Sequence, residues 1–335
     1  MAESPITSMF GVPAAGRSSD GSLAPFNLPT ALVQPMLRAC RGINTLADIL
    51  FYDVGTLLLH HLRGTLLTAV VQHLQQAPDD PPTLRIDLSA LADPEGTILV
   101  VDPQRPPFIA RFDTLDAFVA GLDAMPELRT VTITGVGSSA LGSAAFAWNV
   151  AAALGAPVAA IVPGYGLADL LPQGLGGWCF GLQDWLRHGF QAALTATMPE
   201  AARIGRHLSE EARGGGEAFE TGSPESDVLH ALLRRTERIQ RLYGHSKGAL
   251  CIENALRSLE PGRTKALHAT TYGCVIREDT QATYHQVLGT IDALGQLNSW
   301  FNQPDQWIDS WHTTNTMLPR PMPVTALVAQ AAEAG

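Results

Sequence analysis

The chain has 335 residues, of which 46% are hydrophobic and 16% are charged, and its formal net charge at pH 7 is −10. These apolar side chains are sufficient for a sizeable core, which excludes a chain that is disordered over its whole length. The acidic balance and the lack of any Lys/Arg block disfavour nucleic-acid binding, because phosphate contacts need clustered cations.

Cysteine usage and the first residues of the chain bear on its compartment. Four cysteines are scattered without a C-x-x-C pair: Cys40, Cys179, Cys251 and Cys274. This spacing matches neither a disulfide framework nor a zinc motif, and it suits a reducing cytoplasm. Because no basic and apolar leader follows Met1, we expect no signal peptide and predict a cytoplasmic protein.

Two segments precede the main domain. Residues 1–28 are rich in Ser, Gly, Pro and Ala without a hydrophobic period, and we predict a flexible tail. Residues 29–80 carry apolar side chains at intervals of three and four, which predicts a helical extension. Charged residues and histidines interrupt its apolar run over 49–71, so we expect no membrane span. Its adjacent His60 and His61 do not share a helix face, which argues against a metal pair.

Residues 81–335 are predicted to form one α/β domain. Its first part contains three β-type runs and a short helix, at 84–88, 97–101, 108–112 and 116–122. These short runs are typical of antiparallel strands at the beginning of a larger sheet. A β-branched strand at 130–134, an alanine-rich helix that ends at Gly155 and an apolar strand at 157–162 come next. This β-α-β order predicts parallel strands that are covered on both faces.

The Gly-Ser loop over 135–143 allows three interpretations. It lacks the third glycine of a dinucleotide fingerprint and the Gly-Lys-Ser/Thr of a phosphate-binding loop. It can be an ordinary tight turn. It can also supply a backbone N–H to an oxyanion hole, with Val136 or Gly137 as the donor. We favour the oxyanion donor, although the residues alone separate it only narrowly from the tight turn.

A segment rich in leucine and aromatic residues follows, and we predict a mostly helical cap over about 167–222. An apolar pocket beneath such a cap would suit acyl chains. Its candidate lining residues are Tyr165, Leu175, Trp178 and Phe180. The alternative is that these side chains belong to an ordinary core. A helix predicted over 226–242 then leads to the next motif.

Residues 242–250 contain a G-x-S-x-G pentapeptide between a strand-like and a helix-like run, the context that a nucleophile elbow requires. Ser246 occupies the tip of the turn, where Gly244 and Gly248 leave room for a strained backbone. The following helix points its N-terminal N–H groups toward the serine, where negative charge develops in acyl transfer. The alternative is a glycine-rich turn whose serine caps the helix.

The two residues beside Ser246, His245 and Lys247, are potentially cationic. They could favour an anionic substrate, but we expect both side chains to be solvated.

Further strands and helices complete the domain. We predict strands at 265–276, 284–291 and 305–311, a helix that begins over 278–282 and a last amphipathic helix over 324–332. Ser246, Asp292 and His312 each follow a different predicted strand, at the edge where open parallel sheets place their sites.

Other residues are weaker candidates for the acid and the base. His268 and His285 lie inside predicted strands, as does Asp309, which is close to His312 in sequence. Asp279 is the best alternative acid.

The order Ser246, Asp292, His312 is the one given for α/β-hydrolases. On these residues, and on the 244–248 pentapeptide, the chain over about 130–330 resembles the α/β-hydrolase superfamily and, within it, bacterial lipase/esterase-type serine hydrolases. The resemblance implies an α/β-hydrolase fold, in which helices flank a mostly parallel central sheet, here with a helical cap before the nucleophile strand. It also implies a Ser-Asp-His triad and an oxyanion donor at the N–H of Lys247.

Two departures limit what the resemblance implies. The chain has no His-Gly-Gly-Gly loop, and its predicted cap precedes the elbow strand, whereas many members insert theirs later. The identity of the substrate therefore does not follow from the resemblance.

We expect a serine hydrolase that cleaves a carboxylic ester with a hydrophobic acyl group through an acyl-Ser246 intermediate. His312 would take the serine proton, and Asp292 would fix the imidazole. We expect no metal and no cofactor; the partner would be a small-molecule ester or lipid, and a homo-oligomer is compatible with the sequence. A thioesterase or acyltransferase could use the same triad. A non-catalytic hydrolase fold that binds a ligand, or a nucleotide-binding protein that uses the loop over 135–143, are alternatives of other classes.

Overall fold

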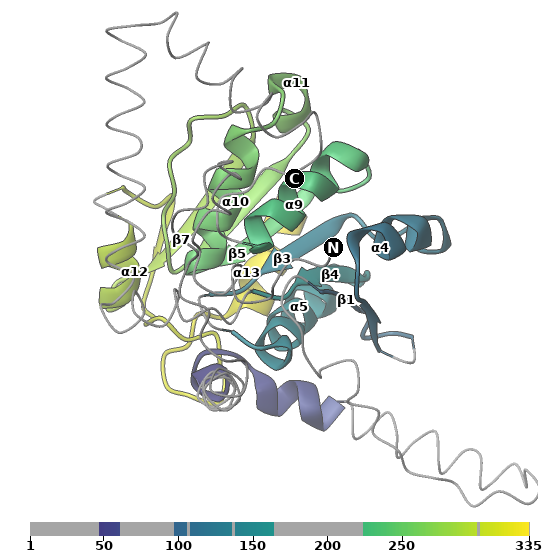
Figure 1. Cartoon of the computed structure of the whole chain (residues 1–335). Coiled ribbons are helices and arrows are strands. Elements are labelled where there is room, and N and C mark those ends of the chain that lie inside the picture. Colours follow the sequence, from purple (N-terminus) through teal and green to yellow (C-terminus); the bar gives the residue numbers. More distant parts are fainter. Residues whose placement is uncertain are drawn as a thin grey trace, which may run out of the picture.

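The computed structural model describes residues 47–60, 97–105, 108–135, 138–163, 224–299 and 302–334. Several predicted segments lie outside these residues: the tail over 1–28, most of the extension over 29–80, the strand at 84–88 and the cap over 167–222. Figure 1 draws the described elements as ribbons. None of their helices is both long and apolar enough to cross a membrane.

The described residues contain an eight-stranded sheet with the order β2-β1-β4-β3-β5-β6-β7-β8. The strands are β1 (Ile98–Val101), β2 (Ile109–Phe112), β3 (Thr130–Ile133), β4 (Val158–Ile161), β5 (Arg241–His245), β6 (His268–Tyr272), β7 (Thr283–Gly289) and β8 (Gln306–Ile308). Strand β1 pairs antiparallel with both β2 and β4, whereas the pairings from β4 through β8 are parallel. The carboxyl ends of β3, β5, β6 and β7 therefore meet at one edge.

Helices cover both faces of this sheet. The side chains of β1 alternate between the faces, because successive strand residues point to opposite sides. One face packs against α4 (Leu115–Gly121), α9 (Pro224–Arg235) and α10 (Lys247–Arg257). The other packs against α5 (Ala140–Leu154) and α13 (Val324–Ala334) (Figure 1). Three shorter helices also lie in the described residues: η2 (Leu122–Ala124), α11 (Pro261–Thr264) and α12 (Ala293–Asn298).

The predicted β-α-β unit is present as β3, α5 and β4, and β3 and β4 pair in parallel. Ser139 is the N-cap of α5, and its side chain accepts a hydrogen bond from the N–H of Leu141. Gly155 ends the helix at φ 61°, a left-handed conformation that glycine adopts without steric cost. The sequence prediction of this unit is thus confirmed.

Residues 47–60 form two short helical turns, 47–51 and 54–60, beside α5 (Figure 1). Tyr52, Val54 and Leu57 are buried in the same apolar cluster as the side chains of α5. The described part of the predicted extension is therefore integrated into the core of the α/β domain.

Two predicted helices differ from the structure. The helix predicted over 226–242 ends at Arg235, and the chain becomes β5 from Arg241. No helix forms over 278–282. Just before this segment, the amide of the buried Gln286 side chain accepts from the N–H of Ile276 (2.7 Å) and donates to the Ile276 carbonyl (3.0 Å). These bonds hold the segment before 278 as an irregular loop.

Candidate active site

The turn between β5 and α10 holds Ser246 in an unusual backbone conformation. Its φ is 55° and its ψ is −126°, a combination that costs a non-glycine residue roughly 1–3 kcal/mol. The Ser246 N–H donates to the carbonyl of Tyr272 (2.9 Å), and the Ser246 carbonyl accepts from the N–H of Ala249 (3.0 Å). Hydrogen bonds on both sides of the residue therefore maintain the strained turn.

Gly244 and Gly248 provide the space that this turn needs. A Cβ on Gly244 would lie 2.7 Å from the backbone nitrogen of Ala249, and a Cβ on Gly248 would lie 2.1 Å from the carbonyl oxygen of Ile133. Both distances are far below van der Waals contact, so α10 can approach β5 and β3 only because these two residues lack side chains. The predicted role of the two glycines is confirmed.

Asp292 and His312 form a buried pair at the same edge of the sheet. The His312 Nδ1 lies 2.9 Å from Oδ1 and 2.9 Å from Oδ2 of Asp292. Asp292 also caps α12, where its Oδ1 accepts from the N–H of Gly295 (2.6 Å). A carboxylate can only accept, so Nδ1 carries the proton, and Nε2 of a neutral imidazole is left as a base.

Gly273 lies against this pair and was missed by the sequence analysis. Its φ is +66°, and a Cβ there would lie 3.0 Å from His312 Nδ1 and 3.2 Å from Asp292 Oδ2. The backbone after β6 thus forms a wall of the Asp–His pair. The strand predicted over 265–276 includes Gly273, whereas the observed strand ends at Tyr272, and a glycine within a β-type run is too common a signal to identify a site.

The loop after β3 lies beside Ser246. A Cβ on Gly135 would come within 3.1 Å of the Ser246 Cβ and 3.5 Å of its Oγ. Val136 and Gly137, the two predicted oxyanion donors of this loop, lie outside the described residues. Lys247 is the first residue of α10, so its N–H belongs to a helix N-terminus, which favours negative charge.

Among the described residues, no hydrogen bond joins the Ser246 hydroxyl to the His312 imidazole. His312 packs against the residue that directly precedes Ser246, since the ring centroids of His312 and His245 are 4.9 Å apart. Catalytic hydrogen bonds are often long in sites without substrate and shorten in the reacting complex.

Both residues that flank Ser246 are buried, and the expectation that they are solvated is wrong. His245 is 1% exposed and Lys247 is 5% exposed. The Lys247 Nζ lies 3.0 Å from Oε1 of the buried Glu225, in the first turn of α9. Burial lowers the pKa of His245 well below its usual range, and the nearby His312 adds to this effect, so the His245 ring is neutral.

A buried carboxylate anchors the start of α5. Asp48 Oδ2 accepts from the N–H of Ser139 (2.8 Å) and of Gly142 (3.3 Å), while Oδ1 accepts from the Ser138 hydroxyl (2.8 Å). Burial raises the pKa of Asp48 to about 6, and these hydrogen bonds partly oppose the rise. Asp48 therefore restrains the far end of the loop whose beginning touches Ser246.

The His312 loop is fastened to the end of the helical turn 47–51. The Asn315 Nδ2 donates to the Ile49 carbonyl (2.7 Å), and the Thr313 hydroxyl donates to the Leu50 carbonyl (2.6 Å). The N–H and the hydroxyl of Thr314 both donate to the Phe51 carbonyl, at 2.8 and 2.9 Å. Helices leave their last carbonyls without intrahelical donors, and the His312 loop supplies those donors.

The alternative acids and bases do not meet this pair. Asp279 lies 2.7 Å from the guanidinium of Arg257. Asp309 lies 3.6 Å from Arg320. His268 is exposed and is the first residue of β6, so it lies at the opposite edge of the sheet from Ser246. His285 lies within β7. The predicted pocket residues, Tyr165, Leu175, Trp178 and Phe180, lie outside the described residues.

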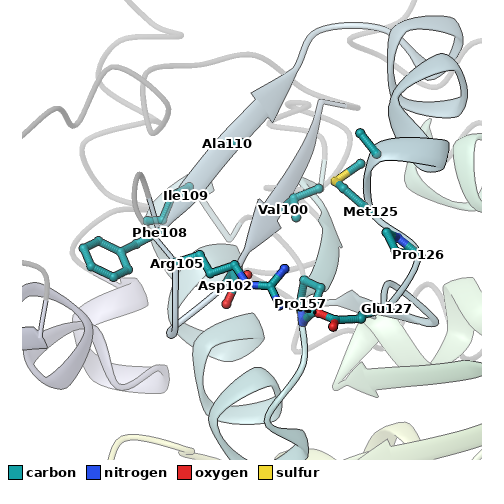
Figure 2. A pocket seen from close by; sticks show the side chains of 11 residues that line it. Val100, Asp102, Arg105, Phe108, Ile109, Ala110, Met125, Pro126, Glu127 and Pro157 are labelled. Atoms are coloured by element: carbon teal, nitrogen blue, oxygen red, sulfur yellow. Dashed lines mark hydrogen bonds and ion pairs between the residues drawn. The ribbon is translucent and has the colours of Figure 1, made fainter.

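A hollow of about 210 Å³ lies elsewhere in the domain, at the end of β1 (Figure 2). Val100, Asp102, Met125 and Pro157 contribute to its lining, and so do Arg105 and Glu127, which form an ion pair of 3.0 Å. Because β1 runs antiparallel to β4, this end of β1 is at the amino edge of the parallel strands. The hollow is therefore separate from the Ser246 site.

The described ranges contain no group of three or more His, Cys, Asp or Glu side chains that could hold a metal ion. Comparison of the chain with models of known protein families, with curated proteins and with solved structures found no match.

Proposed function

We propose that this protein is a serine hydrolase of the α/β-hydrolase type, which cleaves a carboxylic ester through an acyl-Ser246 intermediate. One observation carries the proposal: a buried Asp292–His312 pair, with both oxygens 2.9 Å from Nδ1, lies at the same sheet edge as a serine in a strained strand–helix turn. Strain of this kind persists only where the surrounding structure maintains it, and it is concentrated at functional sites.

The residues would divide the chemistry as follows. The Ser246 Oγ attacks the ester carbonyl while His312 Nε2 takes its proton, and Asp292 stabilises the imidazolium. The carbonyl oxygen, now negatively charged, lies at the N-terminus of α10, with the Lys247 N–H as one donor and the loop after Gly135 as the source of a second. The imidazolium returns its proton to the leaving alcohol. Water then repeats the sequence on the acyl-enzyme and releases the acid.

The surroundings of the pair favour an apolar substrate. Large apolar side chains that are exposed lie next to the candidate residues in sequence: Ile291 and Leu294 on either side of Asp292, and Trp311 before His312. Leu50, whose carbonyl binds the His312 loop, is exposed as well. We therefore propose an ester with a hydrophobic acyl group, including lipid esters, and a cytoplasmic location, which suits the free thiols of Cys251 and Cys274.

The test is hydrolysis of p-nitrophenyl esters of increasing acyl length, together with labelling by a fluorophosphonate. We expect Ser246→Ala to lose both turnover and labelling. Ser258→Ala is the matched control, because Ser258 is an exposed serine at the other end of α10. Labelling without turnover on oxygen esters would favour a thioesterase or acyltransferase that uses the same residues. A wild-type protein that neither turns over nor labels would contradict the proposal and favour a non-catalytic binding protein.

A further inference from the structure

A buried hydrogen-bonded chain runs behind the candidate site. The N–H of Gly135 donates to the Tyr52 hydroxyl (2.7 Å), the Tyr52 hydroxyl lies 3.0 Å from His245 Nδ1, and His245 Nε2 lies 3.0 Å from the carbonyl oxygen of His312. Tyr52 and His245 are both buried. The hydrogen-bonded chain therefore joins four positions that are far apart in sequence: 52, 135, 245 and 312.

The direction of each hydrogen bond is determined by the chemistry of its partners. A carbonyl oxygen can only accept, so His245 Nε2 carries the proton. Because burial keeps this ring neutral, its Nδ1 is an acceptor, and the Tyr52 hydroxyl must donate to it. The Tyr52 oxygen then accepts from Gly135, whose N–H can only donate. Each of the three hydrogen bonds therefore has a single direction, and loss of either partner of the His245 ring would leave a buried ring nitrogen without a hydrogen bond.

The two ends of this chain are parts of the proposed machinery. Gly135 begins the loop that touches Ser246, and His312 is the proposed base. His245, the middle member, directly precedes Ser246. The hydrogen-bonded chain therefore connects the beginning of the loop beside Ser246 to the backbone of the residue that carries the proposed base.

We propose that Tyr52 and His245 are positioning residues of this site, which set the distance between the oxyanion loop at Gly135 and the backbone of His312. The inference rests on the proposed hydrolase function. Neither side chain touches the reacting atoms. They act by holding the loop and the base in one relative position around Ser246, where a displacement of about 1 Å can cost about 10²-fold in rate.

Tyr52→Phe separates this role from simple packing. The Tyr52 ring packs edge-on against Phe146 and His245, with centroid distances of 6.2 and 5.3 Å, and phenylalanine keeps both contacts. Tyr243→Phe is the matched control: Tyr243 is a buried tyrosine of β5 that stacks on Tyr272, and its hydroxyl is not part of the chain.

Two changes at His245 test the chain from its middle. His245→Gln places an amide NH₂ near the position of Nε2, so donation to the His312 carbonyl is kept. His245→Asn places a carbonyl oxygen near the position of Nδ1, so the acceptor for Tyr52 is kept and the bond to His312 is lost. If the hydrogen-bonded chain positions the base, the asparagine variant loses more activity than the glutamine variant.

The measurement is kcat and KM on a p-nitrophenyl ester, with the enzyme concentration taken from fluorophosphonate titration of Ser246 so that only folded, competent sites are counted. We expect Tyr52→Phe to lower kcat about 10-fold or more with KM within about 2-fold, the pattern of a lost transition-state interaction. We also expect the acid limb of the kcat/KM profile against pH, which reports the base, to shift in Tyr52→Phe and to stay in place in Tyr243→Phe.

Two results would overturn the inference while the proposed function stands: a Tyr52→Phe enzyme with the kcat and pH profile of the wild type, or equal losses in both tyrosine variants. If Tyr52→Phe does not fold, the comparison of the two His245 variants decides, and equal activities there would overturn it. A wild type that is neither labelled nor active would instead remove the proposed function itself.

Discussion

His312 Nδ1 is equidistant from the two carboxylate oxygens of Asp292, at 2.9 Å from each, and one of those oxygens also accepts from the Gly295 N–H. A single carboxylate thus caps a helix and orients an imidazole. The two tasks have different sensitivities to substitution, because asparagine is as good a helix cap as aspartate but has no negative charge.

Asp292→Asn is therefore expected to lower kcat about 10³- to 10⁴-fold with little loss of stability, because the amide permits the wrong histidine tautomer and cannot stabilise the imidazolium. The rate is measured by ester hydrolysis and the stability by urea unfolding. Asp309→Asn, at an exposed carboxylate, is the control. An Asp292→Asn enzyme with near wild-type kcat would remove Asp292 from the proposed triad.

Gly273→Ala is expected to lower both stability and kcat. The substitution imposes a side chain at φ +66° and brings its Cβ within 3.0 Å of His312 Nδ1. We expect a loss of roughly 1–3 kcal/mol in the free energy of unfolding. The control is Gly262→Ala, where a Cβ would meet nothing within 4 Å. If Gly273→Ala left both kcat and the free energy of unfolding unchanged, the close contact with His312 would be ruled out.

The Asp48 carboxyl is expected to make stability fall as pH rises. Its pKa is about 6 in the folded chain against an ordinary value of 3.8 for an aspartate carboxyl, so the folded state binds the proton more tightly than the unfolded state. The contribution to the free energy of unfolding therefore decreases between about pH 4 and pH 6, by about 3 kcal/mol for a shift of this size.

Asp48→Asn tests this contribution, because the amide oxygen can still accept from Ser139 and the amide NH₂ can donate to the Ser138 hydroxyl. Urea unfolding at pH 4, 5, 6 and 7 should show the variant gaining on the wild type as pH rises. A difference between the two proteins that stays constant across this range would contradict the raised pKa.

The buried Lys247–Glu225 ion pair is expected to stabilise the turn at Ser246, because Lys247 directly follows the serine. Lys247→Met removes the cation that lies 3.0 Å from a buried carboxylate, and breaking such a pair costs about 3–5 kcal/mol. Because the Lys247 N–H is a backbone group, we expect the folded fraction of the variant to keep its fluorophosphonate labelling. Arg105→Met breaks an exposed pair and should cost at most about 1 kcal/mol. Equal effects of the two changes would show that burial does not strengthen the Lys247 pair.

The parts of the site that the sequence predicts are those with a local signal. The turn at Ser246 follows from two glycines at a fixed spacing between a strand and a helix. Asp292 and His312 follow from their positions after predicted strands. Each of these signals lies within about ten residues, and the structure brings the Asp–His pair together as expected.

Tyr52 and Asp48 could not be found in the same way. Their partners lie 83 positions away for Tyr52 with Gly135 and 90 for Asp48 with Ser138, and contacts at such separations leave no period in the sequence. The same reason explains the error at His245 and Lys247. Polar residue types predict solvent exposure unless a buried partner is known, and these partners come from residue 52 and from α9.

The attachment of the His312 loop has a consequence for how the chain tolerates change. Its acceptors are the main-chain carbonyls of residues 49–51, so almost any side chain could replace the exposed Ile49 or Leu50 without removing the hydrogen bonds. Phe51 differs, because its ring also packs edge-on against the His312 imidazole, with centroids 5.9 Å apart. Insertion or deletion of one residue there would rotate each carbonyl by about 100° around the helix axis. The position of the base is thus robust to substitution at residues 49 and 50 but vulnerable to a change in the length of this segment.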